Sequence, residues 1–228
     1  MSDAPRTSHP SDEVARLEVL RREQVFGGLV WNVRRDTVRL ADGHEVTRDV
    51  QDHPGAVGIL ALNEDDEVLL VKQYRHPTGR YLWEPPAGLL DVDGEHPWRA
   101  AQRELWEEAG MVADEWHVLV DYYNSPGGST EAFRCFLARG VREADGERHQ
   151  GHGEERDMPV EWVPLDDAVA AVLDGRLHNP TAVSGVLAAQ AGRAAGWSSL
   201  RPADAPWPER FPDGLPSLDA GADGPWAG

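Results

Sequence analysis

The sequence predicts an α+β fold in which short strands surround one long amphipathic helix. Runs of alternating apolar and polar residues, which are typical of strands, precede and follow a helical pattern at residues 95–109. Two further helical patterns, at residues 165–173 and 180–195, come late in the chain. Strands on both sides of one helix, with more helices near the end, favour the α+β class.

The first part of the chain predicts a small antiparallel β-sheet after a polar end. Residues 1–15 are polar, and we expect them to be disordered. Residues 25–50 have the pattern of short strands that break at Arg35-Asp36 and at Asp42-Gly43. We therefore expect an N-terminal β subdomain over residues 16–54.

Residues 55–196 carry the patterns of a larger domain. Its strands are expected at residues 56–62, 67–74, 116–123, 132–138 and 160–163. Asn179 and Pro180 are typical of the cap and the first turn of a last helix. Beyond that helix, residues 197–228 are rich in Pro, Gly, Ala and Asp without any periodicity, so we expect a largely disordered tail.

The helix at residues 95–109 has well-marked ends and one buried face. Pro97 suits the first turn, where no backbone donor is needed, and Gly110 suits the left-handed residue that ends a helix. Apolar residues recur at steps of three and four, as on a buried helical face: Trp98, Ala101, Leu105 and Ala109.

Three carboxylates lie on another stripe of the same helix. Glu104 and Glu108 are one helical turn apart, and Glu107 lies three positions after Glu104. Like charges at this spacing destabilise a helix by about 0.2–0.5 kcal/mol per pair, and a hard divalent cation removes that cost. The spacing therefore indicates a metal site. The alternative is a solvated acidic face, which is common in an acidic chain.

Composition narrows the classes of function. The 228 residues carry a formal net charge of −18, so we expect no binding to nucleic acid or to anionic membranes. No apolar run is long enough to span a membrane, and the Met1 end lacks the apolar segment of a signal peptide. We therefore expect a cytoplasmic protein whose single cysteine, Cys135, is a packed thiol rather than a nucleophile.

The stretch from Gly88 to Met111, GLLDVDGEHPWRAAQRELWEEAGM, resembles the Nudix box of Nudix hydrolases. It has the order Gly, Glu, Arg-Glu-Leu, Glu-Glu and Gly-Met. Six residues separate Gly88 from Glu95 where the box has five, but the extra residue precedes the helix and leaves its register unchanged. The resemblance implies a Nudix-type α/β/α sandwich with a mixed sheet, preceded here by the small N-terminal antiparallel sheet.

Residues 25–195 most closely resemble the ADP-ribose pyrophosphatases of this family. The resemblance rests on Gln-Tyr-Arg-His-Pro at residues 73–77, on Trp-Glu-Pro-Pro-Ala-Gly at residues 83–88, and on Pro126, 15 positions after Met111. The segment around Pro126 is similar to the substrate-specificity loop of the subfamily, although an ordinary Pro-Gly turn is the alternative. The expected substrate-binding residues are Arg75, Ser125, Pro126, Gly127, Gly128 and Glu131.

The resemblance also implies a Mg²⁺ site, with Mn²⁺ as an alternative metal. The implied ligands are the carbonyl of Ala87 and the carboxylates of Glu104, Glu107 and Glu108. Glu95 and Arg103 are implied to form a supporting ion pair, with Gly88 and Gly110 as further structural positions; contact of Arg103 with phosphate is the alternative.

The general base is implied to lie in a later loop, HQGHGEERDM at residues 149–158. A mobile acidic loop can bring a carboxylate to the attacking water once metal and substrate are bound. Matching the end of the loop to relatives favours Glu154, with Glu155 as second choice, and Glu107 belongs to the same catalytic cluster. The alternative is a solvated acidic loop.

Together these implications predict Mg-dependent hydrolysis of ADP-ribose to AMP and ribose 5-phosphate. One alternative is a Nudix hydrolase of another nucleoside diphosphate derivative, such as a sugar nucleotide. Another is a non-catalytic ADP-ribose-binding sensor, which needs a DNA-binding module, and no basic recognition helix is visible. Because the N-terminal strands build a dimer interface in relatives, the resemblance also implies a homodimer.

Overall fold

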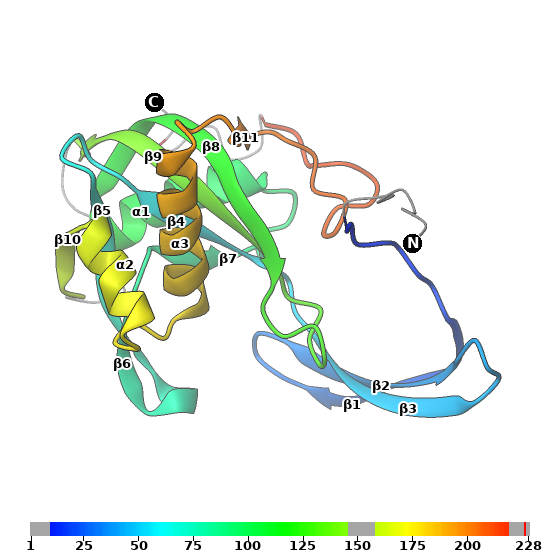
Figure 1. Ribbon diagram of the computed structural model, residues 1–228. Coiled ribbons are helices and arrows are strands. Elements are labelled where there is room, and N and C mark those ends of the chain that lie inside the picture. The colour runs from blue at the N-terminus through cyan, green and yellow to red at the C-terminus, as the bar shows by residue number, and fades with distance from the viewer. Residues whose placement is uncertain (1–9, 146–157, 219–225, 227–228) are drawn as a thin grey trace, which may run out of the picture. The chain divides into compact units, whose positions relative to one another are not determined.

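The computed structural model describes residues 10–145, 158–218 and 226, and it divides into two compact units, residues 1–52 and 53–228 (Figure 1). The first unit is a three-stranded antiparallel sheet, as the sequence predicts. Its strands are β1 (Glu18–Gly27), β2 (Asn32–Arg39) and β3 (Glu45–Asp52), with β2 in the middle.

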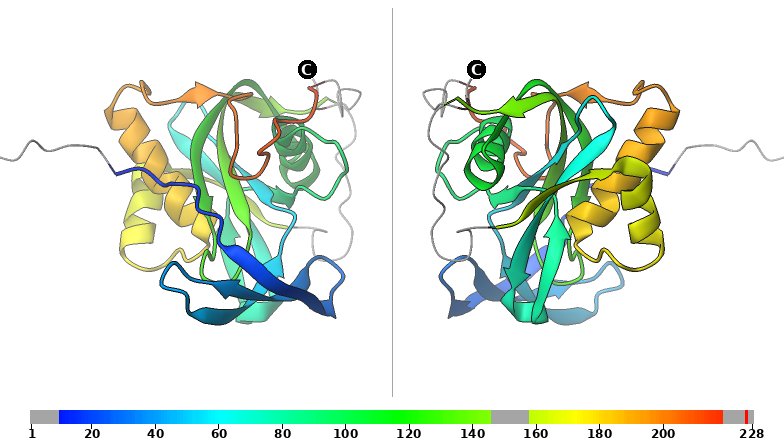
Figure 2. Two further views of the ribbon diagram at one scale, coloured as in Figure 1. Left: turned by 90° about the vertical axis from the view of Figure 1, so that its right-hand side faces the viewer. Right: turned by 90° about the vertical axis from the view of Figure 1, so that its left-hand side faces the viewer.

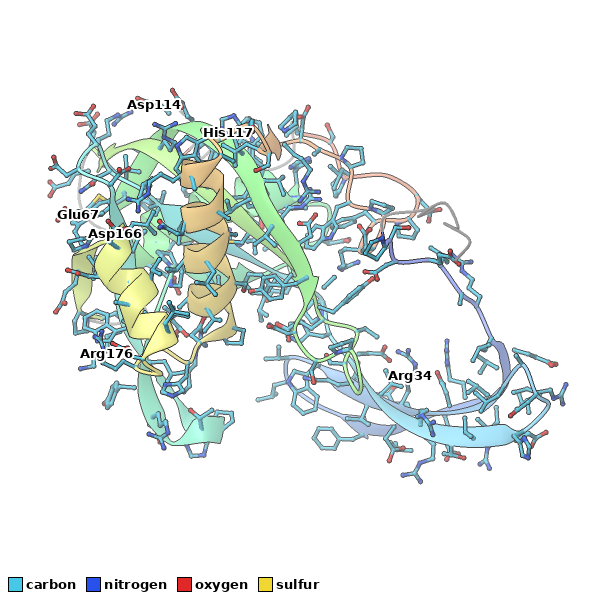
Figure 3. The ribbon with its side chains drawn as sticks, in the orientation of Figure 1. Arg34, Glu67, Asp114, His117, Asp166 and Arg176 are labelled. Carbon is cyan, nitrogen blue, oxygen red and sulfur yellow. The ribbon has the colours of Figure 1, made fainter. Side chains whose placement is uncertain are left out.

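One of the two predicted breaks in this sheet is wrong. Arg35 and Asp36 lie within β2, because each forms an ion pair with a neighbouring strand: Arg35 with Asp49 at 2.6 Å and Asp36 with Arg22 at 2.8 Å. Arg34, labelled in Figure 3, also contacts Asp36 at 3.0 Å. Hydrogen bonds from Arg22 lower the pKa of the buried Asp36 carboxyl to about 2, assisted by Arg34. The chain reverses at residues 28–31 instead, and the turn predicted at Asp42-Gly43 is confirmed.

Within the described parts of the chain, the helices all lie in the second unit. Its strands are β4 (Ala56–Ala61), β5 (Glu67–Arg75), β6 (Arg80–Glu84), β7 (Ala87–Leu89), β8 (Met111–Tyr123), β9 (Ala132–Glu143), β10 (Val160–Pro164) and β11 (Arg201–Pro202). Its helices are α1 (Pro97–Ala109), α2 (Leu165–Leu173) and α3 (Pro180–Ala194), with the short 3₁₀ helix η1 (His76–Thr78) between β5 and β6. No helix among the described residues is long and apolar enough to cross a membrane.

The strands of the second unit form two sheets. The larger sheet has the order β11-β8-β9-β4-β7, and the smaller has the order β10-β5-β6. In the larger sheet β4 and β9 are parallel whereas the other neighbours are antiparallel, so the sheet is mixed. The pairing of β4 with β7 places Val57 opposite Gly88 and Gly58 opposite Ala87. This pairing fixes the backbone on which the candidate site is built.

Helices cover both faces of the larger sheet, as Figure 2 shows. Ile59 of β4 packs with Leu105 of α1 in one apolar cluster. Its neighbour Leu60 points to the opposite face and packs with Val186 of α3 and Leu165 of α2 in a second cluster. Alternation along a strand buried on both faces therefore produces the predicted α/β/α sandwich.

The C-terminal tail differs from the prediction. Residues 200–218 are described, and Trp207 is 1% exposed within the apolar cluster that contains α1. The guanidinium of Arg134, which is itself fully buried, lies 4.6 Å from the centre of the Trp207 ring and donates to the carbonyl of Ala205 at 2.7 Å. Single side chains and the two-residue strand β11, which pairs with β8, attach the tail to the domain, and neither requires a repeating sequence pattern.

Candidate active site

Helix α1 is fixed at both ends by the residues that flank it. Gly110 adopts φ 68° and its N–H donates to the carbonyls of Leu105 and Trp106, so the predicted glycine stop is confirmed. At the other end, Nδ1 of the buried His96 accepts a hydrogen bond from the N–H of Trp98 at 3.1 Å. Burial lowers the pKa of His96 to about 4, so the imidazole is neutral near pH 7 and able to accept this bond.

Arg103 is the centre of an ion-pair network on the outer stripe of α1. Its Nε and Nη2 each donate to one carboxylate oxygen of Glu95 at 3.0 Å, which makes a two-point contact. Its Nη1 donates to Glu104 at 2.6 Å and to Glu107 at 2.9 Å. Burial by itself lowers the pKa of Arg103, but the bonds to Glu95 and the three negative charges raise it well above its ordinary value. The guanidinium therefore stays charged and reduces the repulsion within the acidic stripe.

The backbone of β7 lies directly against two of the carboxylates. The N–H of Ala87 donates to Glu108 at 2.9 Å, and Glu108 is 8% exposed. A Cβ atom placed on Gly88 would lie 2.0 Å from both Cδ and Oε1 of Glu104. Only glycine leaves room for the Glu104 carboxylate at this point. The strand and the helix thus bring Ala87, Glu104 and Glu108 together, and Nη1 of Arg103 holds both Glu104 and Glu107.

The donor set suits a hard cation such as Mg²⁺. Carboxylate and carbonyl oxygens are the ligands that Mg²⁺ prefers, and the carboxylates of Glu104 and Glu108 both lie against the backbone of β7. Within the described part of the chain, no group of three or more His, Cys, Asp or Glu side chains is already gathered as a metal site. Nη1 of Arg103 holds Glu104 and Glu107, so these two carboxylates would have to turn from it to bind a cation.

A cavity of 290 Å³ adjoins this cluster. Ala87 and Gly88 form part of its wall, so the cavity and the carboxylates share the same piece of backbone. Its other walls come from distant parts of the second unit and include His53, Arg75, Asn124, Glu131, Asn179 and Thr181. Two of the predicted substrate-binding residues, Arg75 and Glu131, therefore reach the cavity.

The predicted specificity loop is a tight turn beside the cavity. The carbonyl of Ser125 accepts hydrogen bonds from the N–H groups of Gly128 at 3.0 Å and Ser129 at 2.9 Å. The turn is closed by the side chain of Asn124, which donates to Glu131 at 2.8 Å. Asn124 and Glu131 line the cavity, whereas residues 125–128 are absent from its described lining.

Sequence reasoning missed Glu84, which joins two walls of this cavity. Glu84 is 1% exposed, and its carboxylate lies 2.5 Å from Nη2 of Arg75. The side chain of Asn179, which caps α3 by accepting from Thr181 N–H, also donates to Glu84. Burial raises the pKa of Glu84 in spite of Arg75. No local sequence pattern predicts these contacts, because the partners of Glu84, which are Arg75 and Asn179, lie nine and 95 positions away in the sequence.

The predicted general bases, Glu154 and Glu155, lie outside the described residues. The described chain resumes at Met158 and continues into β10, which pairs with β5.

Comparison with known proteins identifies the family. A family model of the Nudix domain matches residues 52–183 of the chain. The chain belongs to the Nudix family. It is 45% identical over 193 residues to an ADP-ribose pyrophosphatase of Mycobacterium tuberculosis, a match that covers 85% of this chain and 92% of the relative. It is 35% identical over 140 residues to a GDP-mannose pyrophosphatase of Yersinia enterocolitica, which covers 58% of this chain and 71% of that relative.

A solved structure described as an ADP compounds hydrolase has the same fold. It aligns with a TM-score of 0.68 at 21% identity and covers 82% of this chain and 99% of its own. The protein is thus a Nudix hydrolase that acts on a diphosphate bond and is similar to ADP-ribose pyrophosphatases. Nudix hydrolases generally need divalent metal ions, and the donor set at Ala87, Glu104 and Glu108 fits that requirement.

Proposed function

We propose that this Nudix hydrolase cleaves ADP-ribose to AMP and ribose 5-phosphate with Mg²⁺ or Mn²⁺, in the cytoplasm. The observation that carries the proposal is the wall that the carboxylates of α1 share with the 290 Å³ cavity, which is formed by Ala87 and Gly88. A diphosphate in that cavity would lie next to the groups that bind the metal. The 45% identity to a relative with this activity supports the choice of substrate.

The metal would be held by Glu104, Glu108 and the Ala87 carbonyl, with Glu107 in the same cluster. Once bound, it neutralises phosphate charge and lowers the pKa of the attacking water. Arg103 has a different role, because its two-point contact with Glu95 holds the guanidinium so that Nη1 can orient Glu104 and Glu107. Gly88 leaves the space that Glu104 occupies.

The substrate would be oriented by the walls of the cavity. Nε and Nη2 of Arg75 contact Glu84. The third guanidinium nitrogen, Nη1, would therefore be the one that contacts a phosphate or adenine. Glu131 and the Ser125–Gly128 turn would limit which sugar fits at the other side. The water proton would pass to Glu154, with Glu155 as the second choice.

A second substrate class has its own support. The similarity to a GDP-mannose pyrophosphatase favours sugar nucleotides as the alternative, because the carboxylate cluster serves any diphosphate and only the cavity walls select the attached groups. The non-catalytic sensor has no such support, and the net charge of −18 opposes the DNA binding that it requires.

A substrate panel tests these alternatives. Product release would be measured with Mg²⁺ and with Mn²⁺ on ADP-ribose, GDP-mannose, other sugar nucleotides and dinucleotides. AMP formed fastest from ADP-ribose is the expected result. Faster turnover of GDP-mannose would support sugar nucleotides as the substrate class. No turnover of any compound with either metal would favour the non-catalytic ADP-ribose-binding sensor.

We also propose a homodimer built on the N-terminal sheet. Exposed apolar side chains gather at the connection between β1 and β2: Phe26 (55% exposed), Leu29 (108%), Val30 (52%) and Trp31 (38%). The rings of Phe26 and Trp31 are 6.3 Å apart, so they form one patch. Such a patch on a small charged sheet is typical of a surface that another chain covers, and a second copy supplies the same patch in a symmetric contact.

Light scattering at micromolar concentration tests the dimer. The expected mass is twice the chain mass of 25.1 kDa, and Leu29→Asp should shift it toward the monomer. Leu173→Asp, at an exposed apolar residue of α2, is the matched control and should leave the dimer intact. A monomeric wild-type protein would overturn the proposal.

A further inference from the structure

The turn at residues 53–55 forms one edge of the cavity. His53 lines the cavity directly, and β4 begins immediately after the turn, at Ala56. Ala56 pairs with Leu89 of β7, and the carbonyl of Gly55 accepts a hydrogen bond from the N–H of Leu90 at 3.0 Å. The position of this turn therefore affects both the His53 side of the cavity and the strand that carries Ala87 and Gly88.

The turn is held by contacts from distant parts of the sequence. The N–H of His53 donates to the hydroxyl of Thr130 at 3.0 Å, which ties the turn to the loop beside the cavity. On its other side, Nε of Arg210 donates to the carbonyl of Pro54 at 2.6 Å. Gly55 adopts φ +88°, and a Cβ there would lie 3.0 Å from Nε of Arg210. The arginine thus packs on the bare backbone of the turn as well as bonding to it.

The same turn orients the imidazole of His53. Nδ1 of His53 accepts a hydrogen bond from the N–H of Gly55 at 3.1 Å. A ring nitrogen that accepts cannot carry a proton, so the ring hydrogen of the neutral imidazole is at Nε2. A shift of the Pro54-Gly55 peptide would release this bond and free the ring to rotate within the cavity wall.

Arg210 is itself firmly anchored. Its N–H donates to the carbonyl of Trp207 at 3.2 Å, and Trp207 is almost fully buried. The guanidinium of Arg134 lies under the Trp207 ring and donates to the carbonyls of Ala205 and Pro206 at 2.7 Å and 3.0 Å. Asp121 completes this anchor with two bonds from Arg134. The C-terminal segment therefore offers a rigid support from which Arg210 reaches the turn.

We propose that Arg210 is a positioning residue for substrate binding, which acts through the Pro54-Gly55 turn to fix His53 and the β7 wall of the cavity. It makes the C-terminal segment part of the binding apparatus for a nucleoside diphosphate, although Arg210 is not in the cavity lining. The inference rests on the proposed function for the identity of the ligand, and on the contacts of Arg210 for the mechanism.

The test compares Arg210→Met, Arg210→Lys and Arg99→Ala with the wild-type protein. Methionine keeps the packing on Gly55 but cannot donate to Pro54, whereas lysine can donate. Arg99 provides the matched control, because its Nε also binds a tail carbonyl, that of Leu218 at 3.3 Å, but it does not line or brace the cavity. Binding of ADP-ribose would be measured by calorimetry in EDTA, and KM and kcat in Mg²⁺.

Arg210→Met should weaken ADP-ribose binding by about tenfold, the size typical of a residue that acts without touching the ligand. KM should rise by a similar factor and kcat should change less, while Arg210→Lys regains most of the affinity and Arg99→Ala matches the wild type. An unchanged Kd in Arg210→Met would overturn the inference, as would equal losses in Arg210→Met and Arg99→Ala. A wild-type protein that binds ADP-ribose without cleaving it would overturn the proposed function alone, because the Kd comparison stands without turnover. Absence of wild-type binding would overturn both.

Discussion

At the residue scale, the contact between Gly88 and Glu104 sets the tightest constraint in the site. Arg103 and Glu107 are one helical turn apart, Glu104 adjoins Arg103 in sequence, and Glu95 lies just before α1, so the ion pairs around Arg103 all join residues that are close in sequence. The approach of Glu104 to β7 is different, because it depends on how a strand packs on a helix. Glu84 and Asn179 likewise meet only through the tertiary fold. The sequence therefore predicts the acidic stripe of α1. It predicts neither the packing of Glu104 against Gly88 nor the contact between Glu84 and Asn179.

The substitution Gly88→Ala tests whether Glu104 needs the space that Gly88 leaves for its carboxylate. The new methyl group would overlap the Glu104 carboxylate and displace it, so kcat/KM in Mg²⁺ should fall by at least about 100-fold, in line with the loss expected from a misplaced catalytic group. Urea unfolding should also show reduced stability, and adding Glu104→Ala in the same chain should restore part of it by removing the overlap. An active Gly88→Ala enzyme would show that Glu104 does not need this position.

The choice of general base is tested by Glu154→Gln and Glu155→Gln. Glutamine keeps the size of the side chain but cannot take a proton, so Glu154→Gln should lower kcat by about 10²–10⁴-fold and change KM far less. Glu155→Gln is the matched control at the neighbouring residue, and its kcat should stay near that of the wild type. The reverse order of the two effects would move the role to Glu155, and two near-normal enzymes would place the base outside this loop.

At the element scale, α1 is the best predicted part of the molecule because its signals are local. Pro97, Gly110 and the apolar spacing define its ends and buried face, and the structure agrees within two residues at the start. β2 is the counterexample: Arg35 and Asp36 have the composition of a turn, yet cross-strand ion pairs make them strand residues. Which charged residues are paired across a sheet depends on register, which this stretch of sequence does not reveal.

The cap of α1 makes stability depend on pH. The pKa of His96 in the folded protein, about 4, lies below its ordinary value of 6.5, so the unfolded chain takes up a proton first as the pH falls. The contribution of His96 to stability is therefore complete above about pH 6.5 and is lost as the pH falls toward about 4. Each unit of difference in pKa is worth about 1.4 kcal/mol.

Urea unfolding of the wild type and of His96→Asn, at pH 7 and near pH 5, measures this effect. Asparagine can still cap the helix but does not titrate in this range. The wild type should lose more stability than the variant between the two pH values. Equal losses would mean that His96 does not contribute to the pH dependence.

At the scale of the whole molecule, contacts between residues far apart in the sequence determine the features that sequence patterns do not predict. The α/β/α sandwich follows from strand and helix patterns that repeat, and the prediction of this fold is confirmed. The tail has no repeating pattern, and its burial depends on Trp207 meeting Arg134, 73 positions earlier. An aperiodic segment with isolated aromatic residues is therefore ambiguous from sequence, because composition cannot distinguish an anchor from an exposed side chain.

Replacement of Trp207 by alanine tests whether this side chain attaches the C-terminal tail to the domain. Loss of a fully buried tryptophan costs about 3–5 kcal/mol, and here it also leaves the guanidinium of Arg134 without its aromatic partner. Tyr81→Ala, at an aromatic residue of β6 that is 68% exposed, should cost much less. The free energies of unfolding from urea titrations provide the comparison, and equal costs would show that the tail does not hold the domain together.

The carboxylates of α1 that lie against β7 are proposed to support metal-dependent hydrolysis. The most direct measurement is kcat for ADP-ribose in Glu108→Gln across a Mg²⁺ titration, with Glu115→Gln, an exposed position in β8, as the control. Glutamine can keep the bond to the Ala87 N–H but removes the charge, so kcat should fall by at least about 100-fold, with control turnover unchanged. Wild-type turnover and metal dependence in Glu108→Gln would show that Glu108 does not bind the metal.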